Sequence, residues 1–289
     1  MMYHMDESVG AIVDALSNAK MLKNSIIIFS TDNGGPAEGF NLNAASNSPL
    51  RGVKNTLWEG GVRGAGLIWS PLLRDSERVS HQYIHISDWL PTLYSAAGGD
   101  ERNLKDLDGM NLWNELSESL QSKRVEILHN IDPIWGSAAL TVNQWKIMAG
   151  SNYNGDWDSW YGPAGDRNTS SYIINNLQTS KTAMALKSLG MFPPNAKISR
   201  LRAKATVTCG KNNPKSKCKP LDVPCLFDIM EDPCEQNNVA FQYPNILETL
   251  ANRLLDFNRS SLPPGNLPID PRGNPLYYDR VWTNFGDYF

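Results

Sequence analysis

The chain has 289 residues, with 27 basic and 30 acidic side chains and a formal net charge of -3. This length suffices for one large α/β domain and a small second one, and the nearly balanced charge gives no electrostatic reason to expect nucleic acid as a partner. No apolar run approaches the roughly 18 residues that a membrane-spanning helix needs, so we expect no membrane span.

The first element is expected to be an amphipathic helix, because apolar side chains recur at intervals of three and four residues. They are Met5, Val9, Ile12, Val13 and Leu16. Residues 25–30 then form a continuous β-branched and apolar run, typical of a strand buried on both faces of a parallel sheet. This order of helix, short connection and buried strand is typical of an α/β domain.

A second inner strand is expected at residues 65–70, which form another apolar run. A helix is expected to begin near Ser87 or Asp88, because either side chain can accept hydrogen bonds from the free amides of a first turn. Pro91 is tolerated in that turn. We assign these elements to one α/β domain, residues 1–125.

A smaller α+β domain with an antiparallel sheet and long loops is predicted for residues 126–289. Short strand-like pieces alternate with turn residues at its start, and another lies at residues 225–229. After Pro244 the spacing of apolar residues predicts a helical face. Its members are Ile246, Leu247, Leu250, Leu254 and Leu255. Residues 150–215 show little periodicity and are rich in Asn, Ser, Gly and Pro, which predicts a long loop region.

The four cysteines fall within one short segment, which predicts a local disulfide framework. A zinc site is the alternative, but the sequence contains no Cys-x-x-Cys pair. We expect Cys209 to pair with Cys218, and Cys225 to pair with Cys234, because turn residues at 231–233 would bring the chain back beside Cys225. Four cysteines permit three pairings, so the crossed ones stay open.

Two Asn-x-Ser patterns begin at Asn168 and Asn258, and such patterns accept N-linked glycans in exported proteins. Disulfides likewise favour an oxidising compartment. Residues 1–7 lack the basic and apolar regions of a signal peptide. We therefore expect a lysosomal or secreted protein whose signal peptide lies upstream of this fragment.

A candidate metal site follows the first predicted strand, since ligands bind at the carboxyl ends of strands in α/β sheets. Asp32 and Asn33 lie there, followed by Gly34 and Gly35. Carboxylate and amide oxygens suit calcium or magnesium, and the glycines allow a sharp turn. A tight turn without a metal is the alternative, because Asn-Gly is a strong turn dipeptide.

A candidate anion-binding residue lies in the glycine-punctuated segment 49–63. Lys54 is close in sequence to Glu59, Arg51 and Arg63. A lysine beside an acidic metal site can hold an oxyanion such as sulfate through its positive charge. A solvated loop lysine is the alternative.

These segments together resemble the sulfatase family, and within it the arylsulfatase B (N-acetylgalactosamine-4-sulfatase) type. The matching motifs are Ser-Thr-Asp-Asn-Gly-Gly at residues 30–35, Leu-Arg-Gly at 50–52 with Lys54, and Leu-Trp-Glu-Gly-Gly-Val-Arg at 57–63. Further matches lie at residues 85–93, 107–109 and 128–133. The likeness is dense up to about residue 148 and weak between 150 and 220.

The resemblance implies an alkaline-phosphatase-like sheet sandwiched by helices, of which this chain is the C-terminal part. It also implies a calcium-dependent sulfuric ester hydrolase acting on sulfated sugars, glycosaminoglycans or aryl sulfates. In that reading Asp32 and Asn33 bind the calcium ion and Lys54 contacts the substrate sulfate.

The resemblance further implies a formylglycine nucleophile made from the cysteine of a Cys-x-Pro-x-Arg motif. The one Cys-x-Pro in this sequence begins at Cys218 and has Asp222 in place of the arginine. We therefore expect no catalytic nucleophile in this chain and no hydrolysis by it alone. The alternative is a non-catalytic, truncated module that binds or has a structural role.

His85 and His129 are not expected to act in catalysis, because a lone histidine is more often a hydrogen-bonded packing residue. Asp88 is expected to cap a helix. The pattern indicates no particular oligomeric state.

Overall fold

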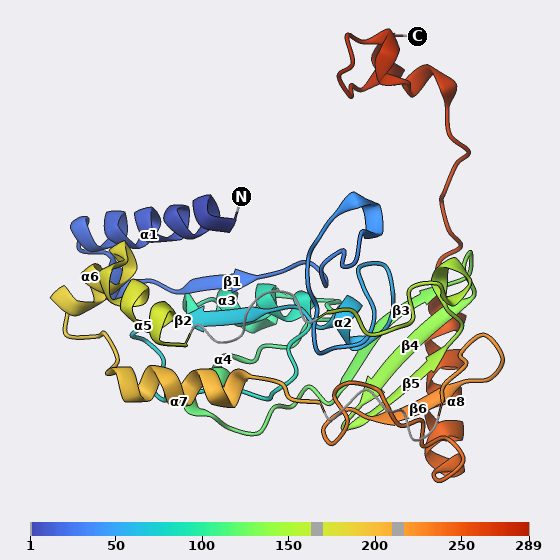
Figure 1. Ribbon diagram of the computed structural model, residues 1–289, viewed down its shortest axis with the longest axis horizontal. Coiled ribbons are helices and arrows are strands. Elements are labelled where there is room, and N and C mark those ends of the chain that lie inside the picture. Colours follow the sequence, from blue (N-terminus) through green and yellow to red (C-terminus); the bar gives the residue numbers. More distant parts are fainter. Residues whose placement is uncertain (1, 163–169, 210–216, 289) are drawn as a thin grey trace.

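The structure is a computed structural model that describes residues 2–162, 170–209 and 217–288. Figure 1 shows helices and a short two-stranded ribbon at one end, a four-stranded sheet with a long helix at the other, and C-terminal residues that extend away from both. No helix within the described ranges is long and apolar enough to cross a membrane.

The first helix, α1 (Met2–Asn18), is followed by β1 (Ile27–Ser30), which pairs antiparallel with β2 (Gly66–Trp69). The other helices of this end are α3 (Trp89–Ala96), α4 (Trp113–Glu118), α5 (Ser170–Thr179), α6 (Lys181–Ser188) and α7 (Asn195–Ala205). The one-turn helix α2 (Glu59–Val62) lies next to the four-stranded sheet (Figure 1). The predicted helix and both predicted strands are confirmed as elements.

The expectation that residues 25–30 are buried on both faces of a parallel sheet is wrong for this structure. β1 and β2 form an antiparallel ribbon, with Ile27 opposite Trp69. Among the described residues, apolar side chains of α1 and α6 pack at the Ile27 end of this ribbon. Beyond that cover Phe29 is 37% exposed and Leu67 is 55% exposed.

Three helices, α5 to α7, lie in the segment that was expected to be a long loop region, so that expectation is wrong in part. α6 packs against α1, where Ala185 joins Val13 and Leu22 in one apolar cluster. The hydroxyl of Ser180 accepts a hydrogen bond from the amide of Ala183 at 3.1 Å and caps α6. The helices are short and their apolar faces narrow, so their periodicity is weak in the sequence.

The second sheet has the order β3-β4-β5-β6 and is antiparallel throughout. Its strands are β3 (Glu126–Asp132), β4 (Ser137–Val142), β5 (Trp145–Ala149) and β6 (Cys225–Asp228). The long helix α8 (Pro244–Ser260) covers one face, where Leu250 and Leu254 meet Leu140 and Ile147. Leu255, which was expected on that face, is 54% exposed. The antiparallel sheet and its helix agree with the predicted α+β architecture, and a division at residue 125 stays a prediction.

The opposite face of this sheet packs against the segment predicted to contact substrate. Side chains alternate along a strand, so Met148 points away from α8 and joins Phe227 and Trp58 in a second cluster. Trp58 and Phe227 are fully buried, with ring centroids 5.8 Å apart. The sheet therefore fixes the position of the loop that begins at Arg51 and ends at Arg63.

Two disulfides are present, as expected, but the predicted pairing is wrong. The structure joins Cys209 to Cys234 and Cys218 to Cys225, with Cα atoms 6.1 and 5.7 Å apart, and no described cysteine is free. A turn closed by hydrogen bonds to the carbonyl of Lys219 brings Cys218 back beside the start of β6. The two bridges are therefore nested, one inside the other.

Candidate functional site

The loop after β1 presents the two predicted metal ligands. Asp32 is exposed and Asn33 is half-buried. Asp32 Oδ1 accepts a hydrogen bond from the amide of Asn33 at 2.9 Å, and Asn33 Nδ2 donates to the carbonyl of Gly34 at 2.7 Å. Among the described residues no donor reaches Asp32 Oδ2 or Asn33 Oδ1. Both oxygens are therefore available to a hard cation such as calcium.

Gly34 lets this loop touch the glycine-rich segment from 57 to 63. Its amide donates to the carbonyl of Gly61 at 2.8 Å. A Cβ atom at Gly34 would lie 1.7 Å from the carbonyl oxygen of Gly60, so only glycine fits this close approach. The contact brings the two motifs, which are separate in sequence, into one place.

Lys54 lies at the same junction. Its amide donates to the carbonyl of Gly35 at 3.2 Å, and its side chain is half-buried. The backbone of Lys54, the lysine predicted to hold an oxyanion, is therefore hydrogen-bonded to the loop of Asp32 and Asn33. Its ammonium group has no ionic partner among the described residues.

Asn47 ties these loops together and was not identified from the sequence. Its Oδ1 accepts from the amide of Gly35 at 2.6 Å, and its Nδ2 donates to the carbonyls of Gly35 and Gly52 at 2.7 and 3.2 Å. An amide side chain in an Asn-rich stretch gives no periodic signal, so only the fold shows this role.

The side-chain oxygens of Asp32 and Asn33 fit part of a calcium site. Calcium takes about six to eight oxygen ligands, and Asp32 and Asn33 supply two of the right kind. Among the described residues no three His, Cys, Asp or Glu side chains come close enough to hold a metal together. These two residues can therefore bind calcium only with further oxygen ligands.

A buried triad of charged side chains links the segment that contains Lys54 to the four-stranded sheet. Lys146 on β5 reaches Glu59 Oε1 at 2.9 Å and Glu235 Oε1 at 2.8 Å. Glu235 Oε2 accepts a hydrogen bond from the amide of Glu59 at 2.7 Å. The side chains of Lys146 and Glu235 are 0% exposed and that of Glu59 is 7% exposed. One ammonium thus connects the sheet, the loop and the residue that follows Cys234.

The two carboxylates of the triad titrate in opposite directions. Burial raises the pKa of Glu235 to about 7, despite the positive charge of Lys146. Burial is also the largest influence on Glu59 and opposes its charged form, but the charge and hydrogen bond of Lys146, together with other nearby basic groups, outweigh it and hold the pKa below its usual value. Burial disfavours the ammonium too, yet Glu235 and Glu59 raise the pKa of Lys146 above its usual value. One cation can compensate only one buried anion fully, so the second carboxylate retains its proton more easily.

We expect Glu235→Gln to remove a pH dependence of stability. Because the pKa of Glu235 is raised in the folded state, its contribution is fully present below about pH 4.5 and is lost as the pH rises through about 7. Between pH 4.5 and pH 8, the free energy of unfolding of the glutamine variant should therefore rise by about 3 kcal/mol relative to that of the wild type. Urea unfolding of both proteins across this range measures the difference, and parallel stability curves would contradict it.

The guanidinium group of Arg51 lies between the rings of Trp58 and Trp160, in the same glycine-rich segment as Glu59. Its guanidinium carbon lies 3.5 Å from the ring centre of Trp58 and 4.5 Å from that of Trp160, which is cation–π geometry. Its Nε donates to the carbonyl of Asp158 at 2.7 Å, and the indole of Trp58 donates to Asp158 Oδ1 at 2.7 Å. Burial lowers the pKa of Arg51 to about 10. Arg51 therefore has a packing role and stays charged at neutral pH.

His129 has the structural role that was expected of it, and Asp88 caps a helical turn as expected. His129 is bonded to the hydroxyl of Thr141 at 2.8 Å, and burial, with the charge of Lys146 next, lowers its pKa to about 3. Asp88 accepts the amide of His85 at 2.8 Å and so completes a capping box at the turn Ile86–Asp88, which leads directly into α3. It makes no capping hydrogen bond to α3 itself, and it also forms a buried ion pair with Arg124.

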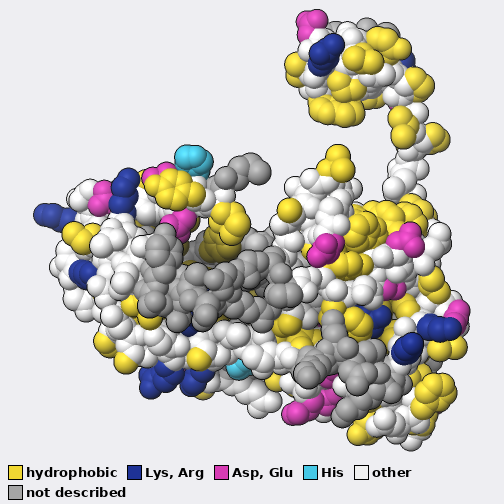
Figure 2. Space-filling view, viewed as in Figure 1, with side chains coloured by type: hydrophobic (Ala, Val, Ile, Leu, Met, Phe, Trp, Pro, Cys, Tyr) yellow, Lys and Arg dark blue, Asp and Glu magenta, His cyan; other side chains and the backbone are white. Residues whose placement is uncertain are grey.

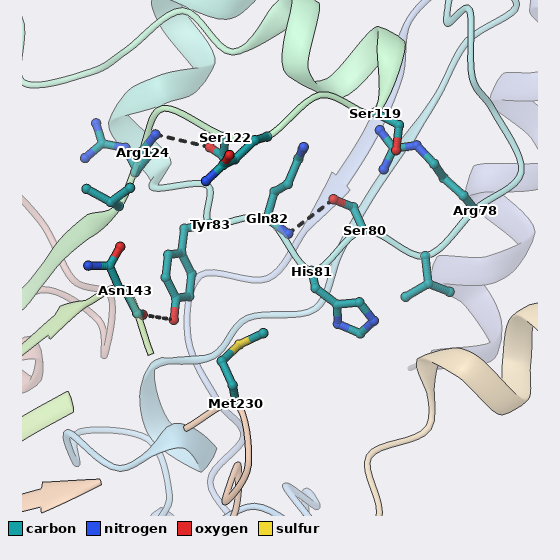
Figure 3. Close-up of a pocket in the computed structure, with 13 residues that line it drawn as sticks. Arg78, Ser80, His81, Gln82, Tyr83, Ser119, Ser122, Arg124, Asn143 and Met230 are labelled. Atoms are coloured by element: carbon teal, nitrogen blue, oxygen red, sulfur yellow. Dashed lines mark hydrogen bonds between the residues drawn. The ribbon is translucent and has the colours of Figure 1, made fainter. Parts of the chain in front are cut away.

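A cavity of about 420 Å³ lies away from the two motif loops. Figure 3 shows Arg78 and Ser119 at one end and Tyr83 and Asn143 near the other. Its lining includes none of Asp32, Asn33 and Lys54. The cavity is therefore no part of the predicted sulfate site.

Of the two predicted glycan acceptors, Asn258 is exposed near the end of α8. Asn168 lies outside the described residues. Glycosylation at both stays a prediction.

Comparison of the sequence with known proteins finds similarity to sulfatases. The sulfatase family profile matches residues 1–99. Arylsulfatase J of Mus musculus is 36% identical over 297 residues, which cover 96% of this chain and 42% of that protein. N-acetylgalactosamine-6-sulfatase of Sus scrofa is 33% identical over 142 residues, which cover 49% of this chain and 27% of that protein. The chain is homologous to sulfatases. It spans less than half the length of these two relatives, and the narrower arylsulfatase B type stays a prediction.

Solved structures show that this chain has the sulfatase fold. The crystal structure of Ps i-CgsB superposes with a TM-score of 0.60 at 19% identity, covering 100% of this chain and 48% of the other. That of the PsFucS1 sulfatase from Pseudoalteromonas sp. gives 0.53 at 19% identity, covering 87% and 40%. The predicted alkaline-phosphatase-like fold is thereby confirmed.

Proposed function

We propose that a longer protein containing this chain is a calcium-dependent sulfuric ester hydrolase. One observation supports the proposal: the amide of Gly34 donates to the carbonyl of Gly61, and the amide of Lys54 donates to the carbonyl of Gly35, so the two motif loops contact each other. A cation-binding pair beside an uncommitted ammonium suits the anionic oxygens of a sulfate ester. The homology of the chain to sulfatases supports the same reaction class.

Each residue has a distinct role in this proposal. Asp32 and Asn33 supply two of the oxygen ligands of calcium, and the bound ion supplies positive charge for the sulfate oxygens. Lys54 holds a sulfate oxygen as a point charge and orients the ester. The buried triad of Glu59, Lys146 and Glu235 keeps the loop of Lys54 against the sheet.

Cys218 is not the nucleophile, because its sulfur is bonded to Cys225. The sequence contains no Cys-x-Pro-x-Arg motif. We therefore propose that the nucleophile is contributed by sequence beyond these 289 residues and that the chain alone hydrolyses no sulfate ester.

We propose a sulfated sugar as the substrate, with the specificity of arylsulfatase B as the narrower expectation. The relative named N-acetylgalactosamine-6-sulfatase supports a sulfated sugar, since its name specifies one. A lysosomal or secreted location is part of the proposal, because two disulfides suit an oxidising compartment.

We expect Lys54→Ala, in the longer protein, to raise the KM for an aryl sulfate roughly tenfold or more. A hydrogen bond to a charged group contributes about 1.5–3 kcal/mol, and the variant loses it. Steady-state hydrolysis measures the change, with Lys105→Ala as a control because Lys105 is an exposed lysine outside the site. An unchanged KM would assign Lys54 to the solvated surface, and a folded longer protein without turnover would favour a non-catalytic module.

A further inference from the structure

The basic residues of this chain are unevenly distributed. Between Asp166 and Asp222 there is no acidic residue, although the whole chain has more acidic than basic side chains. The same 55 residues contain eleven basic ones: Arg167, Lys181, Lys187, Lys197, Arg200, Arg202, Lys204, Lys211, Lys215, Lys217 and Lys219. The rest of the chain therefore has a net charge of about -14, and this one segment is strongly positive.

The charge is concentrated on α7. Arg200, Arg202 and Lys204 are exposed, and none makes an ion pair with a residue that the structure describes. Lys197 on the same helix is paired with Glu77. Figure 2 shows Lys and Arg side chains gathered at the edge where Figure 1 places α7.

Helix stability alone does not explain this cluster. Cations in the last turn interact favourably with the helix dipole, by about 0.3–1 kcal/mol each, and Arg202 and Lys204 lie in that turn. Arg200 lies before it, and helix surfaces ordinarily intersperse anions at three- and four-residue spacing. α7 carries no anion at all.

The basic helix leads to the loop of Lys54. Four residues after α7 ends, Cys209 Sγ lies 3.9 Å from the carbonyl oxygen of Pro49. Cys209 is also bonded to Cys234, the neighbour of Glu235 in the buried triad. The disulfide thus fixes the chain that follows α7 beside the loop that carries Lys54.

We propose that α7 is a binding surface for a sulfated polysaccharide chain, outside the site that hydrolyses the ester. The unpaired cations Arg200, Arg202 and Lys204 span about 6 Å of helix axis. Because residues two apart do not face each other on a helix, they project to more than one side, which suits several sulfate groups along a polymer better than one. This choice of polyanion rests on the proposed function, since a sulfatase of polymeric sugars must hold a chain with many sulfates. The surface raises the affinity for long substrates without adding a contact at the reacting ester.

The test measures binding of the 289-residue chain to immobilised heparin, a sulfated polysaccharide, over a range of salt concentrations. We expect the variant Arg200→Ala, Arg202→Ala, Lys204→Ala to bind about tenfold more weakly and with a shallower salt dependence. Alanine favours helix, and the three side chains are exposed, so the fold should survive. The matched control is Lys20→Ala, Lys23→Ala, Lys105→Ala, which changes the net charge equally at exposed lysines elsewhere.

Three outcomes would overturn the inference: equal weakening in both triple variants, no weakening in either, or binding of duplex DNA as tight as that of heparin. Desulfated heparin should not bind. Aryl sulfate turnover of the longer protein, measured separately, should be unchanged in the α7 variant. If that turnover is absent while heparin binding still depends on α7, the proposed hydrolase function fails and the binding surface stands.

Discussion

Replacing Lys146 with alanine is expected to lower the free energy of unfolding of this chain by about 3–5 kcal/mol. The side chain is fully buried and is the shared partner of Glu59 and Glu235. Its removal leaves two carboxylates out of water without a counter-ion and a cavity where its stem was packed. Urea unfolding, followed by circular dichroism, measures the loss.

Two controls separate charge from packing. Lys146→Met keeps most of the buried stem, so a loss close to that of alanine would show that the charge is the main contribution. Lys105→Ala, at an exposed lysine, should change stability by less than about 0.5 kcal/mol. A Lys146→Ala protein as stable as the wild type would mean that the triad contributes nothing to folding. The loss should also be smaller at pH 5 than at pH 8, because the raised pKa of Glu235 lets it bind a proton.

Asp32→Ala and Asn33→Ala are each expected to weaken calcium binding of the longer protein by 10-fold or more and to lower kcat strongly. Each variant removes one oxygen ligand from a hard cation that depends on several. Calorimetric titration with calcium and hydrolysis of an aryl sulfate measure the two effects. Added calcium should partly restore the activity of both variants.

An acidic residue away from the junction gives the control. Asp6 is exposed on α1, so Asp6→Ala should leave calcium affinity and kcat unchanged. If Asp32→Ala behaves like Asp6→Ala, the Asp-Asn-Gly-Gly segment is only a tight turn, the alternative that the dipeptide itself suggests.

The elements that sequence predicts best here are those with local signals. The periodicity of α8 identified Leu250 and Leu254 as buried, and both are. The glycines of the two motifs indicated close backbone approach, and Gly34 meets Gly60 with no room for a side chain. Local spacing and local turn chemistry decide such features, so one sequence is enough to find them.

Long-range partners were not predictable in the same way. Lys146 interrupts an apolar strand, which is a signal of a buried charge, but its partner Glu235 lies 89 residues further along the chain. The cysteine pairing failed for a related reason. Nearest-neighbour loops are the simplest choice in sequence, whereas the turn after Cys218 and the return of the chain to Cys209 are set by tertiary packing.

The inner-strand prediction for residues 25–30 shows a third limit of local pattern. An apolar composition shows that a strand can be buried, but it does not show what will cover the strand. In the part of the chain that the structure describes, α1 and α6 pack at the Ile27 end of the ribbon. Phe29 and Leu67 are left exposed. The pattern therefore predicted the element correctly and its surroundings wrongly.

The most direct test of the central claim is a crystal structure of the longer protein grown with calcium and inorganic sulfate. The account predicts a calcium ion about 2.3–2.6 Å from side-chain oxygens of Asp32 and Asn33, and a sulfate oxygen within about 3 Å of Lys54 Nζ. Calcium bound elsewhere, with Asp32 and Asn33 facing only water and Lys54 pointing into solvent, would contradict it.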